Sequence, residues 1–590
     1  VNVRIYMFRL ILLSITLLYL SGCATYELKT ANLNSNAPLP QQHGMVSVEV
    51  INNVDRLAPL HKGWSELIVL RLDNRDALKQ AAIEEAKAKA VQKNKAFDES
   101  KVEWDPDVYT LTPHSRGLIE SQVFVGSLPE GEYVVASLYS FFSNGEIMSW
   151  ISMPVNYLAG KFEIKQNTTT NLGSIAFQPL KSIKEKSFWD STSSNKAFVT
   201  RLDQAINMSD FIKHHYPVAS QQLHANKELQ WQNDEFDSLR SSLAQLVREN
   251  AFPSSHFALN KFGKAIITSR FGQARILNHK GTWDAVNLPT NIQLLSAIEL
   301  NQGIALAGEK GELYYSDSNL KNWRQIKPVE TDQAIVWMAN NGNQSFALTA
   351  SAKQYTVYQF FDIKDKWNQI GQYKRKNSND WLVQNGGIFP FFNSNNQLNI
   401  LNDNKLHVYQ QATNTWSMEK ALELKELIQL PGSELLAIEV SQWDGVGDTV
   451  YKLTPESEWV VVKKNANNLF GNDNVELSLP VVRKDHSLIN IAYYKEHKNA
   501  KSELRVMYAS SDNPKQWIAK GKASKSCTQT LPKISYDKTL YVMCERGQIK
   551  ATDDLGYTWY SVLDVNIDKM QNEFETLLNA LEKVEQNKEN

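Results

Sequence analysis

The chain has 590 residues, of which 42% are hydrophobic and 22% are charged. These fractions are close to the averages of folded proteins, so they argue against a wholly disordered chain and against a membrane protein with many spanning segments. Lysine and arginine number 63 and aspartate and glutamate 64, which gives a net charge of -1 at pH 7. Because there is no excess of positive charge, nucleic acid is not an expected partner.

The first residues predict export. Arg4 and Arg9 precede an apolar run over residues 10–20. This run is too short to cross a bilayer, which takes about 20 helical residues, and its layout is that of a secretory signal. The run ends in a Leu-Ser-Gly sequence followed by Cys23. This motif resembles the lipobox of bacterial lipoproteins, in which the cysteine becomes the lipidated first residue of the mature chain.

The lipobox resemblance implies an address and a membrane anchor. It implies a signal peptide over residues 1–22 and a lipid on Cys23, and Ala24 in the family's sorting pattern implies the outer membrane. The protein is then expected to face the periplasm or the cell surface. Residues 23–44 show little apolar periodicity and are expected to form the lipidated tether.

Two further cysteines, Cys527 and Cys544, are expected to form a structural disulfide, because an exported protein folds in an oxidising compartment. A reactive or metal-binding pair is the alternative, but no Cys-x-x-Cys motif or nearby histidine supports it. We expect no metal and no cofactor.

Residues 45–180 are expected to form a small β-sandwich. Val46, Val48 and Val50 alternate with polar residues, as in a half-buried strand. Residues 128–135 read Leu-Pro-Glu-Gly-Glu-Tyr-Val-Val, in which proline and glycine predict a tight turn before another strand. This turn resembles that of transthyretin-like and carboxypeptidase-regulatory-like β-sandwiches, and the resemblance implies a domain that does no chemistry.

A helix is expected inside this sandwich. Residues 76–97 are rich in good helix formers, and Glu85 and Lys89 have the spacing of a supporting ion pair. Their apolar stripe is thin, so we expect a solvated surface helix. A partner-binding arm is the alternative.

Residues 181–250 are expected to be a helical connector. Phe198, Leu202 and Ile206 recur at a spacing of four, which is typical of one helix face. Three histidines in this segment could suggest a metal site, but adjacent helical residues point about 100 degrees apart and no carboxylates accompany them. We expect these three histidines to be exposed: His214, His215 and His224.

Residues 252–562 carry a repeat. Seven tryptophans each follow a short polar turn, and they are separated by 40, 44, 49, 43, 58 and 42 residues. This period is close to that of a four-stranded propeller blade, so the array predicts seven blades. The seven residues are Trp283, Trp323, Trp367, Trp416, Trp459, Trp517 and Trp559.

The last repeat contains the best-preserved turn motif, whose residues are Thr552, Asp554, Gly556, Thr558 and Trp559. Two partial copies keep Ser510, Asp512 and Trp517 in one repeat, and Ser316 and Trp323 in another. The array resembles the Asp-box propellers, which include the BNR repeats of sialidases and the photosystem II assembly factor family. The resemblance implies that the motif is structural, with the aspartate capping turn amides and the tryptophan packing between sheets.

The predicted fold is therefore mainly β: a seven-bladed β-propeller preceded by a small β-sandwich, with a helical connector and a C-terminal helix. That helix, residues 563–590, carries apolar residues at steps of three and four from Ile567 to Val584. We expect this face to pack on the helix predicted at 236–247 or on the propeller rim. A coiled-coil contact with another chain is the alternative.

Catalysis is not expected. Sialidase chemistry needs arginines gathered at the propeller axis, together with a tyrosine and acidic groups. The arginine motif that precedes the first blade in sialidases is missing, although five arginines lie in the array: Arg270, Arg275, Arg324, Arg483 and Arg505.

The expected function is that of a lipid-anchored binding or scaffold protein that contacts an envelope protein or an assembling complex. A glycan-binding or sialidase-like propeller is the alternative. Trp443 stands among turn residues and is a candidate contact residue, while a buried Trp443 that packs at a sheet edge is the alternative.

Overall fold

The computed structural model describes residues 28–53, 63–114, 121–143, 148–184, 193–203, 208–224, 229–254, 258–259, 265–301, 303–317, 320–330, 332–342, 344–351, 353–375, 387–429, 435–439, 449–453, 459–464, 479–497, 499–514, 516–531 and 538–589. Over these residues the fold is mainly β, as predicted, with two N-terminal sheets followed by a series of four-stranded sheets. The helices are α2 (Arg75–Gln92), α3 (Ser209–His215), α4 (Pro217–Ser220), α5 (Asp237–Glu249) and α6 (Ile567–Glu589).

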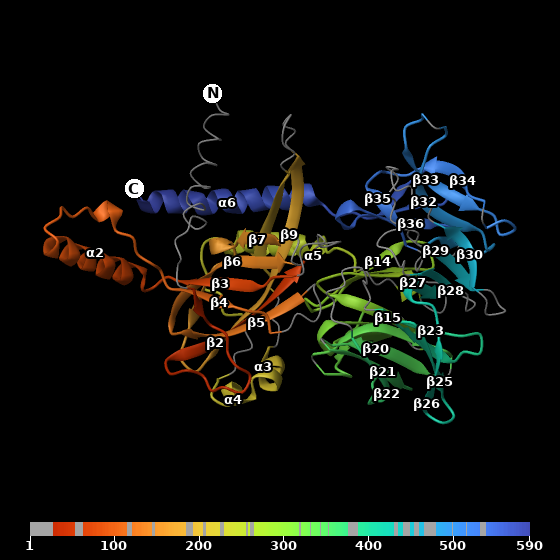
Figure 1. Ribbon diagram of the computed structural model, residues 1–590, viewed down its shortest axis with the longest axis horizontal. Helices are drawn as coiled ribbons and strands as arrows, with labels where there is room; N and C mark the ends of the chain where they lie inside the picture. The colour runs from red at the N-terminus through yellow and green to blue at the C-terminus, as the bar shows by residue number, and fades with distance from the viewer. Residues whose placement is uncertain are drawn as a thin grey trace.

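Two sheets packed face to face form the N-terminal part (Figure 1). Sheet A has the order β1-β4-β3-β6-β7, with β8 also paired to β6, and sheet B has the order β10-β9-β2-β5. Their shared apolar core includes Val48, Leu67 and Phe124. Sheet A consists of β1 (Lys29–Thr30), β3 (Glu66–Arg71), β4 (Val108–Leu111), β6 (Gly131–Ser143), β7 (Met148–Pro154) and β8 (Lys161–Ile164). Sheet B consists of β2 (His43–Asn52), β5 (Ser121–Pro129), β9 (Thr169–Lys184) and β10 (Ser193–Arg201).

The expected tether is wrong for residues 28–44, which are part of the sandwich. Lys29 and Thr30 form β1, which runs parallel to β4. Ala31 and Leu39 are only 2% and 9% exposed. The apolar side chains of this segment are few and follow no period in the sequence, yet Ala31, Leu33 and Leu39 pack in the apolar clusters of the sandwich.

The expectation of a half-buried strand at Val46 is also wrong. Strand β2 lies between β9 and β5, and its outer face is covered as well as its core face. Met45 packs with α3 and α4, and Ile51 packs with α5 and α6. Between them, Glu49 is fully buried.

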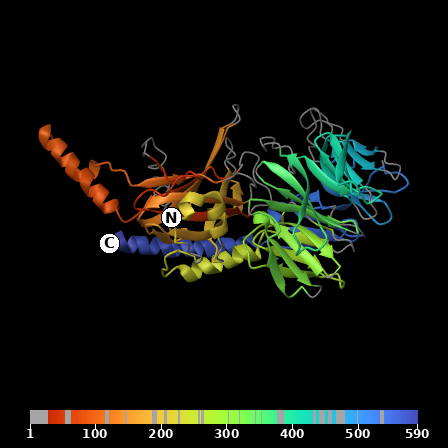
Figure 2. The same ribbon diagram turned by 90° about the horizontal axis from the view of Figure 1, so that it is seen from below.

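The connector is only partly helical. Phe198 and Leu202 were expected on a helix, but Phe198 lies in β10, which pairs antiparallel with β9. Their spacing of four places both in the apolar cluster that sheet B shares with α5 and α6. Helix α6 runs beside α5 and along the sandwich, which confirms the packing expected for the C-terminal stripe (Figures 1 and 2).

The array is built from sheets of four consecutive antiparallel strands. Sheet 1 contains β11 (Ala258–Leu259), β12 (Ala265–Thr268), β13 (Gln273–Leu277) and β14 (Trp283–Asn287); sheet 2 contains β15 (Leu294–Leu300), β16 (Gly303–Gly308), β17 (Leu313–Asp317) and β18 (Trp323–Ile326). Sheet 3 contains β19 (Ala334–Asn340), β20 (Ser345–Ala350), β21 (Gln354–Phe360) and β22 (Asn368–Lys374); sheet 4 contains β23 (Ile388–Phe392), β24 (Leu398–Asn402), β25 (Lys405–Gln410) and β26 (Thr415–Lys420). Sheet 5 contains β27 (Leu424–Gln429), β28 (Leu435–Glu439), β29 (Thr449–Leu453) and β30 (Trp459–Lys464); sheet 6 contains β31 (Val481–Val482), β32 (Leu488–Tyr494), β33 (Glu503–Ala509) and β34 (Ile518–Lys522). Sheet 7 contains β35 (Cys527–Thr530), β36 (Leu540–Cys544), β37 (Ile549–Thr552) and β38 (Tyr560–Leu563).

These sheets pack side by side as a ring. Each sheet shares an apolar cluster with the next one, from sheets 1 and 2 through sheets 6 and 7. A last cluster joins Ile267 of sheet 1 to Tyr541 and Ala551 of sheet 7. First strands lie next to each other, as β15 does to β19 and β23 to β27, so they form the inner wall. This is the arrangement of a β-propeller.

Candidate binding surface

The seven repeat tryptophans are structural. Each lies within one residue of the start of the fourth strand of its sheet, and each packs in the apolar cluster shared with the preceding sheet. Two of them also donate an indole N–H to a carbonyl on the outer strand of the preceding sheet. Trp559 donates to Lys522 O at 2.8 Å, and Trp416 donates to Ile370 O at 2.6 Å. These rings hold blades together, so they are not free to stack on a ligand.

The Asp-box turn of sheet 7 is closed by its own side chains. Asp554 accepts hydrogen bonds from the N–H of Thr558 at 2.8 Å and from its hydroxyl at 2.7 Å, and these bonds lower the pKa of Asp554 to about 2. Thr552 Oγ1 accepts the N–H of Gly556 at 2.9 Å. Leu555 and Gly556 have positive φ angles of 59° and 89°. An aspartate held ionised by its own turn caps that turn and has no role as an acid.

The weaker copies keep less of this geometry. Ser510 Oγ accepts the N–H of Asp512 at 3.2 Å. Ser316 is buried and lies opposite Trp323 across the β17–β18 pair. Trp517 packs between sheets 5 and 6.

The remaining predicted site residues divide into two groups. Cys527 and Cys544 face each other across β35 and β36, are joined by a disulfide and are buried. The bridge therefore fixes the two inner strands of sheet 7. Cys23 and Trp443 lie outside the described residues.

The arginines that sialidase chemistry would need are kept apart. Arg275, Arg324 and Arg505 lie on the third or fourth strands of sheets 1, 2 and 6, away from the inner wall. Arg270 is buried and donates to the carbonyls of the linker residues Phe252 and Pro253 at 3.3 and 3.1 Å. These positions do not form a carboxylate clamp at the axis.

The described residues contain no group of three or more side chains that could hold a metal. His214 and His224 are exposed as expected, but His215 is half-buried against His114, with ring centroids 4.2 Å apart. His114 Nδ1 lies 2.9 Å from the Tyr216 hydroxyl. Burial, with a smaller contribution from the charges of His114 and His214, lowers the pKa of His215 to about 4. His215 packs α3 onto the sandwich, which explains its burial.

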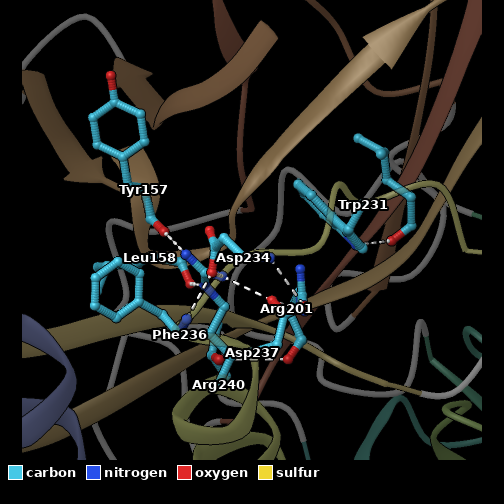
Figure 3. A network of polar contacts seen from close by, with 10 residues as sticks. Tyr157, Leu158, Arg201, Trp231, Asp234, Phe236, Asp237 and Arg240 are labelled. Carbon is cyan, nitrogen blue, oxygen red and sulfur yellow. Dashed lines mark hydrogen bonds and ion pairs between the residues drawn. The ribbon is translucent and has the colours of Figure 1, made fainter. Parts of the chain in front are cut away.

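A buried ion-pair network fastens α5 to the sandwich (Figure 3). Arg240 is fully buried and donates to Asp234 at 2.5 Å and to Asp237 at 3.0 Å. It also donates to the carbonyls of Leu158 and Tyr157, at 3.1 and 2.9 Å. Arg201 of β10 completes the network by donating to Asp237 at 2.7 Å.

A second buried pair joins the sandwich to sheet 2. Glu49 of β2 lies 2.5 Å from Lys310, which stands in the turn between β16 and β17. Ser174 donates to Glu49 at 2.8 Å, and Ser121 donates to the neighbouring Glu309 at 2.9 Å. Burial is the largest single effect and lowers the pKa of Lys310, but the charge and hydrogen bond of Glu49 and the charges of Glu312 and Glu309 together outweigh it, so the pKa is raised. Lys310 therefore keeps its charge beside Glu49, and the pair sets how the sandwich sits on the ring.

The contacts of the sandwich and its linker define two faces of the ring. The turns between second and third strands, and the connections between sheets, lie at one face, because successive strands run in opposite directions. Lys310 lies there, as do Asn291, which accepts from Arg248 of α5 at 2.5 Å, and Gly547, which abuts Phe252. We call this the covered face.

The open face holds the turns between first and second strands and between third and fourth strands. No contact described between the sandwich or its helices and the ring falls on these turns. Phe361 and Tyr557 stand on them, each 70% exposed. Asn341 donates to Asn396 O at 3.0 Å, linking the turns of sheets 3 and 4. The described turns include residues 278–282, 361–367, 393–397, 411–414, 483–487 and 553–559, which are mostly polar.

Neither a protein-family model nor a curated protein sequence matches the chain. Solved β-propellers are similar to about half of it. The structure described as YCF48 bound to D1 peptide is 15% identical and covers 48% of this chain and 86% of its own, with a TM-score of 0.34. The extracellular domain of BT4673 from B. thetaiotaomicron is 10% identical and covers 51% of this chain and 38% of its own, with a TM-score of 0.33. BamB from Moraxella catarrhalis is 12% identical and covers 51% and 84%, with a TM-score of 0.30.

The propeller architecture rests on the sheets and their apolar clusters, not on these low scores. Among the described residues, no helix combines the length and the apolar character needed to span a bilayer.

Proposed function

We propose that the protein is a lipoprotein of the cell envelope, anchored to the outer membrane through Cys23, whose seven-bladed β-propeller binds another envelope protein or an assembling complex. The observation that carries this proposal is the open face of the ring. Sandwich, linker and helices attach only to the covered face in the described residues, which leaves a broad surface of polar turns with exposed aromatics. Rigid blades that present variable turns are suited to protein binding.

The position of the sandwich supports the same role. Just after β1, Asn32 forms a bridge with Gly126 of β5, and Gly126 also pairs with Val46 near the start of β2. The chain therefore enters the sandwich close to the start of β2. At the other end of β2, Asn53 accepts the N–H of Phe252, the residue that leads into the ring, at 2.8 Å. From Val46 to Asn53 a strand spans about 23 Å. The sandwich therefore acts as a spacer between the anchored end and the propeller.

Crosslinking and affinity capture from native envelopes test the proposal. The wild-type protein should retain a stoichiometric protein partner, and the Cys23→Ala variant should lose it through mislocalisation. A double variant on the open face, Phe361→Asp with Tyr557→Asp, should lose the partner while remaining anchored. Trp150→Asp is the matched control, since Trp150 is 66% exposed on β7 of the sandwich.

Two results would overturn the proposal. One is partner capture that survives the open-face changes but is lost in the Trp150 control. The other is capture of cell-wall or capsular glycan without any protein, which would instead support the glycan-binding alternative. A sialidase-like reaction is not proposed, because Arg275, Arg324 and Arg505 lie away from the inner wall and Arg270 donates to the carbonyls of the linker.

A further inference from the structure

Strand β7 leaves one edge of the sandwich open. It is the last strand of sheet A, and in the part of the chain that the structure describes it pairs only with β6 (Figure 1). Strand β10 of sheet B lies beside it without belonging to the same sheet. Phe141, Trp150 and Ile151 at this edge are 49%, 66% and 37% exposed. An apolar edge strand that is left open is a template for pairing with another strand.

The neighbours of β7 show which of its backbone groups point outwards. On β6, the N–H of Phe141 donates to Ser65 Oγ at 3.1 Å, and its carbonyl accepts from the same hydroxyl at 3.4 Å. Ser65 leads into β3, so Phe141 turns its backbone groups away from its β7 partner, Trp150. Opposite residues of an antiparallel pair turn their backbone groups either towards each other or both away. Trp150 therefore points its N–H and C=O out of the sheet edge, as do Met148 and Ser152 two residues on either side.

Other edge strands have protection against pairing that β7 lacks. The sequence of β7 is Met-Ser-Trp-Ile-Ser-Met-Pro, without a charge. The outer strand of sheet 7 is followed at once by Asp564, and the outer strands of sheets 1 to 6 each carry a charged side chain: Asp284, Arg324, Lys374, Glu419, Lys463 and Lys520. In the sandwich, β5 is also uncharged, but Asn32 and Pro113 form bridges to it. Charge or cover of this kind keeps an edge from pairing, and β7 has neither.

The outward groups of β7 match those of a second β7 best in one register. Around a two-fold axis an antiparallel strand pairs with its own copy, so one residue lies opposite itself. With Trp150 at the axis, Met148 lies opposite Ser152 of the second copy, and all the outward residues enter hydrogen-bonded pairs. With Ile151 at the axis, Met148 would lie opposite Pro154, which has no N–H to donate. The proline therefore favours the register with Trp150 at the axis.

We propose that two copies of the chain pair through β7, with Trp150 opposite its own copy at a two-fold axis. The two A sheets then form one continuous sheet. Phe141 and Trp150 are cross-strand neighbours in each copy, so four aromatic side chains line up across four adjacent strands. A charge at the axis would meet its own copy, and β7 carries none. The patch is smaller than the roughly 800 Å² per partner of a standard interface, so we expect a dissociation constant of about 10 µM.

Sedimentation equilibrium of the mature chain carrying Cys23→Ser tests the inference, because it needs neither a lipid nor an envelope partner. The parent chain should show a monomer–dimer equilibrium. Trp150→Asp sets two carboxylates opposite each other and should raise the dissociation constant at least about a hundredfold. Trp150→Lys should do the same with two ammonium groups. An equimolar mixture of these two variants should regain dimers, because opposite charges then meet at the axis, and this recovery also shows that both variants are folded.

Met418→Asp is the matched control, since Met418 is 60% exposed on β26 of the ring, and it should dimerise as the parent does. A parent chain that stays monomeric at about 100 µM would overturn the inference, as would a mixture that stays monomeric or equal dimerisation of both aspartate variants. A monomeric parent whose Trp150→Asp variant loses the envelope protein would show a strand of that protein on β7 instead. Otherwise Trp150→Asp should keep its envelope partner, so loss of the dimer and failure of the proposed function are distinguishable.

Discussion

Helix α6 provides a test of how the ring is held closed. In the described residues every sheet of the ring is formed from four consecutive strands, so no sheet joins the two ends of the array. The chain enters beside Asn250 and leaves beside Asn566, whose N–H donates to the Asn250 side chain at 2.6 Å. Helix α6 then returns along α5. We infer that the packing of α5 and α6 holds the two ends of the ring together.

Leu577→Ala tests this inference. Leu577 is fully buried in the cluster that α6 shares with α5 and sheet B, where the rings of Phe574 and Phe198 stack with centroids 4.9 Å apart. Truncating a buried leucine costs about 2–5 kcal/mol. Since about 1.4 kcal/mol is a tenfold change, the docked state of α6 should become about 30-fold to about 4,000-fold less stable.

Native-state hydrogen exchange measures this change. We expect faster exchange in α6 and α5 and, because the ring closes less firmly, in β12 of sheet 1 and β36 of sheet 7, while sheet 4 is unchanged. Asn579→Ala, at an exposed position of the same helix, is the control. Unchanged exchange in α6 would refute the packing. Faster exchange in α6 with β12 and β36 unchanged would refute its role in closing the ring.

Three further changes test other contacts. Arg240→Ala removes a fully buried cation, while Asp234 and Asp237 are 31% and 28% exposed and Asp237 keeps Arg201. The lost hydrogen bonds should destabilise the attachment of α5 by about 1–3 kcal/mol, so that proteolysis begins at a lower urea concentration than in the wild type. Cleavage that begins at the same urea concentration as in the wild type would contradict this. Replacing Cys527 and Cys544 by serine removes a crosslink with a sequence separation of 17 and should lower stability by about 3 kcal/mol, a difference that should vanish when the wild type is reduced. Burial and the neighbouring His114 and His214 hold the pKa of folded His215 at about 4, below its ordinary 6.5. The unfolded chain therefore binds more protons between these pH values, and stability should fall as the pH drops from 6.5 towards 4. His215→Gln should flatten that dependence in urea titrations, and an unchanged slope would show that His215 is not its source.

The sheets of the ring were predictable because one residue type recurs at one structural position. A tryptophan at the start of each fourth strand fills the gap to the preceding sheet, and this gap is the same around the ring. The Asp-box turn was predictable for a related reason, since Asp554 and Thr558 are close in sequence and bond to each other. Local contacts leave local signals.

The attachments between domains were missed because their partners are far apart in sequence. Glu49 and Lys310 are separated by more than 200 residues, and nothing local distinguishes a buried glutamate in an alternating strand from an exposed one. Phe198 and Leu202 have a spacing that fits a helix face as well as a strand that continues into a turn. Among these attachments, the α5 network has a local sequence signal, because Asp234, Asp237 and Arg240 follow one another at intervals of three residues.

The attachments also determine how the open face is presented. A propeller on a free tether of 20 residues samples many orientations, and a partner that binds it must remove that freedom at a cost in entropy. Here most of the expected tether is part of the sandwich, and the sandwich is fixed to the ring by Arg240 and by the pair of Glu49 and Lys310. With the proposed lipid on Cys23, the open face therefore samples fewer orientations above the membrane than it would on a free tether of that length. A partner held in the same membrane meets it with less orientational freedom to lose, which favours binding without any additional contact.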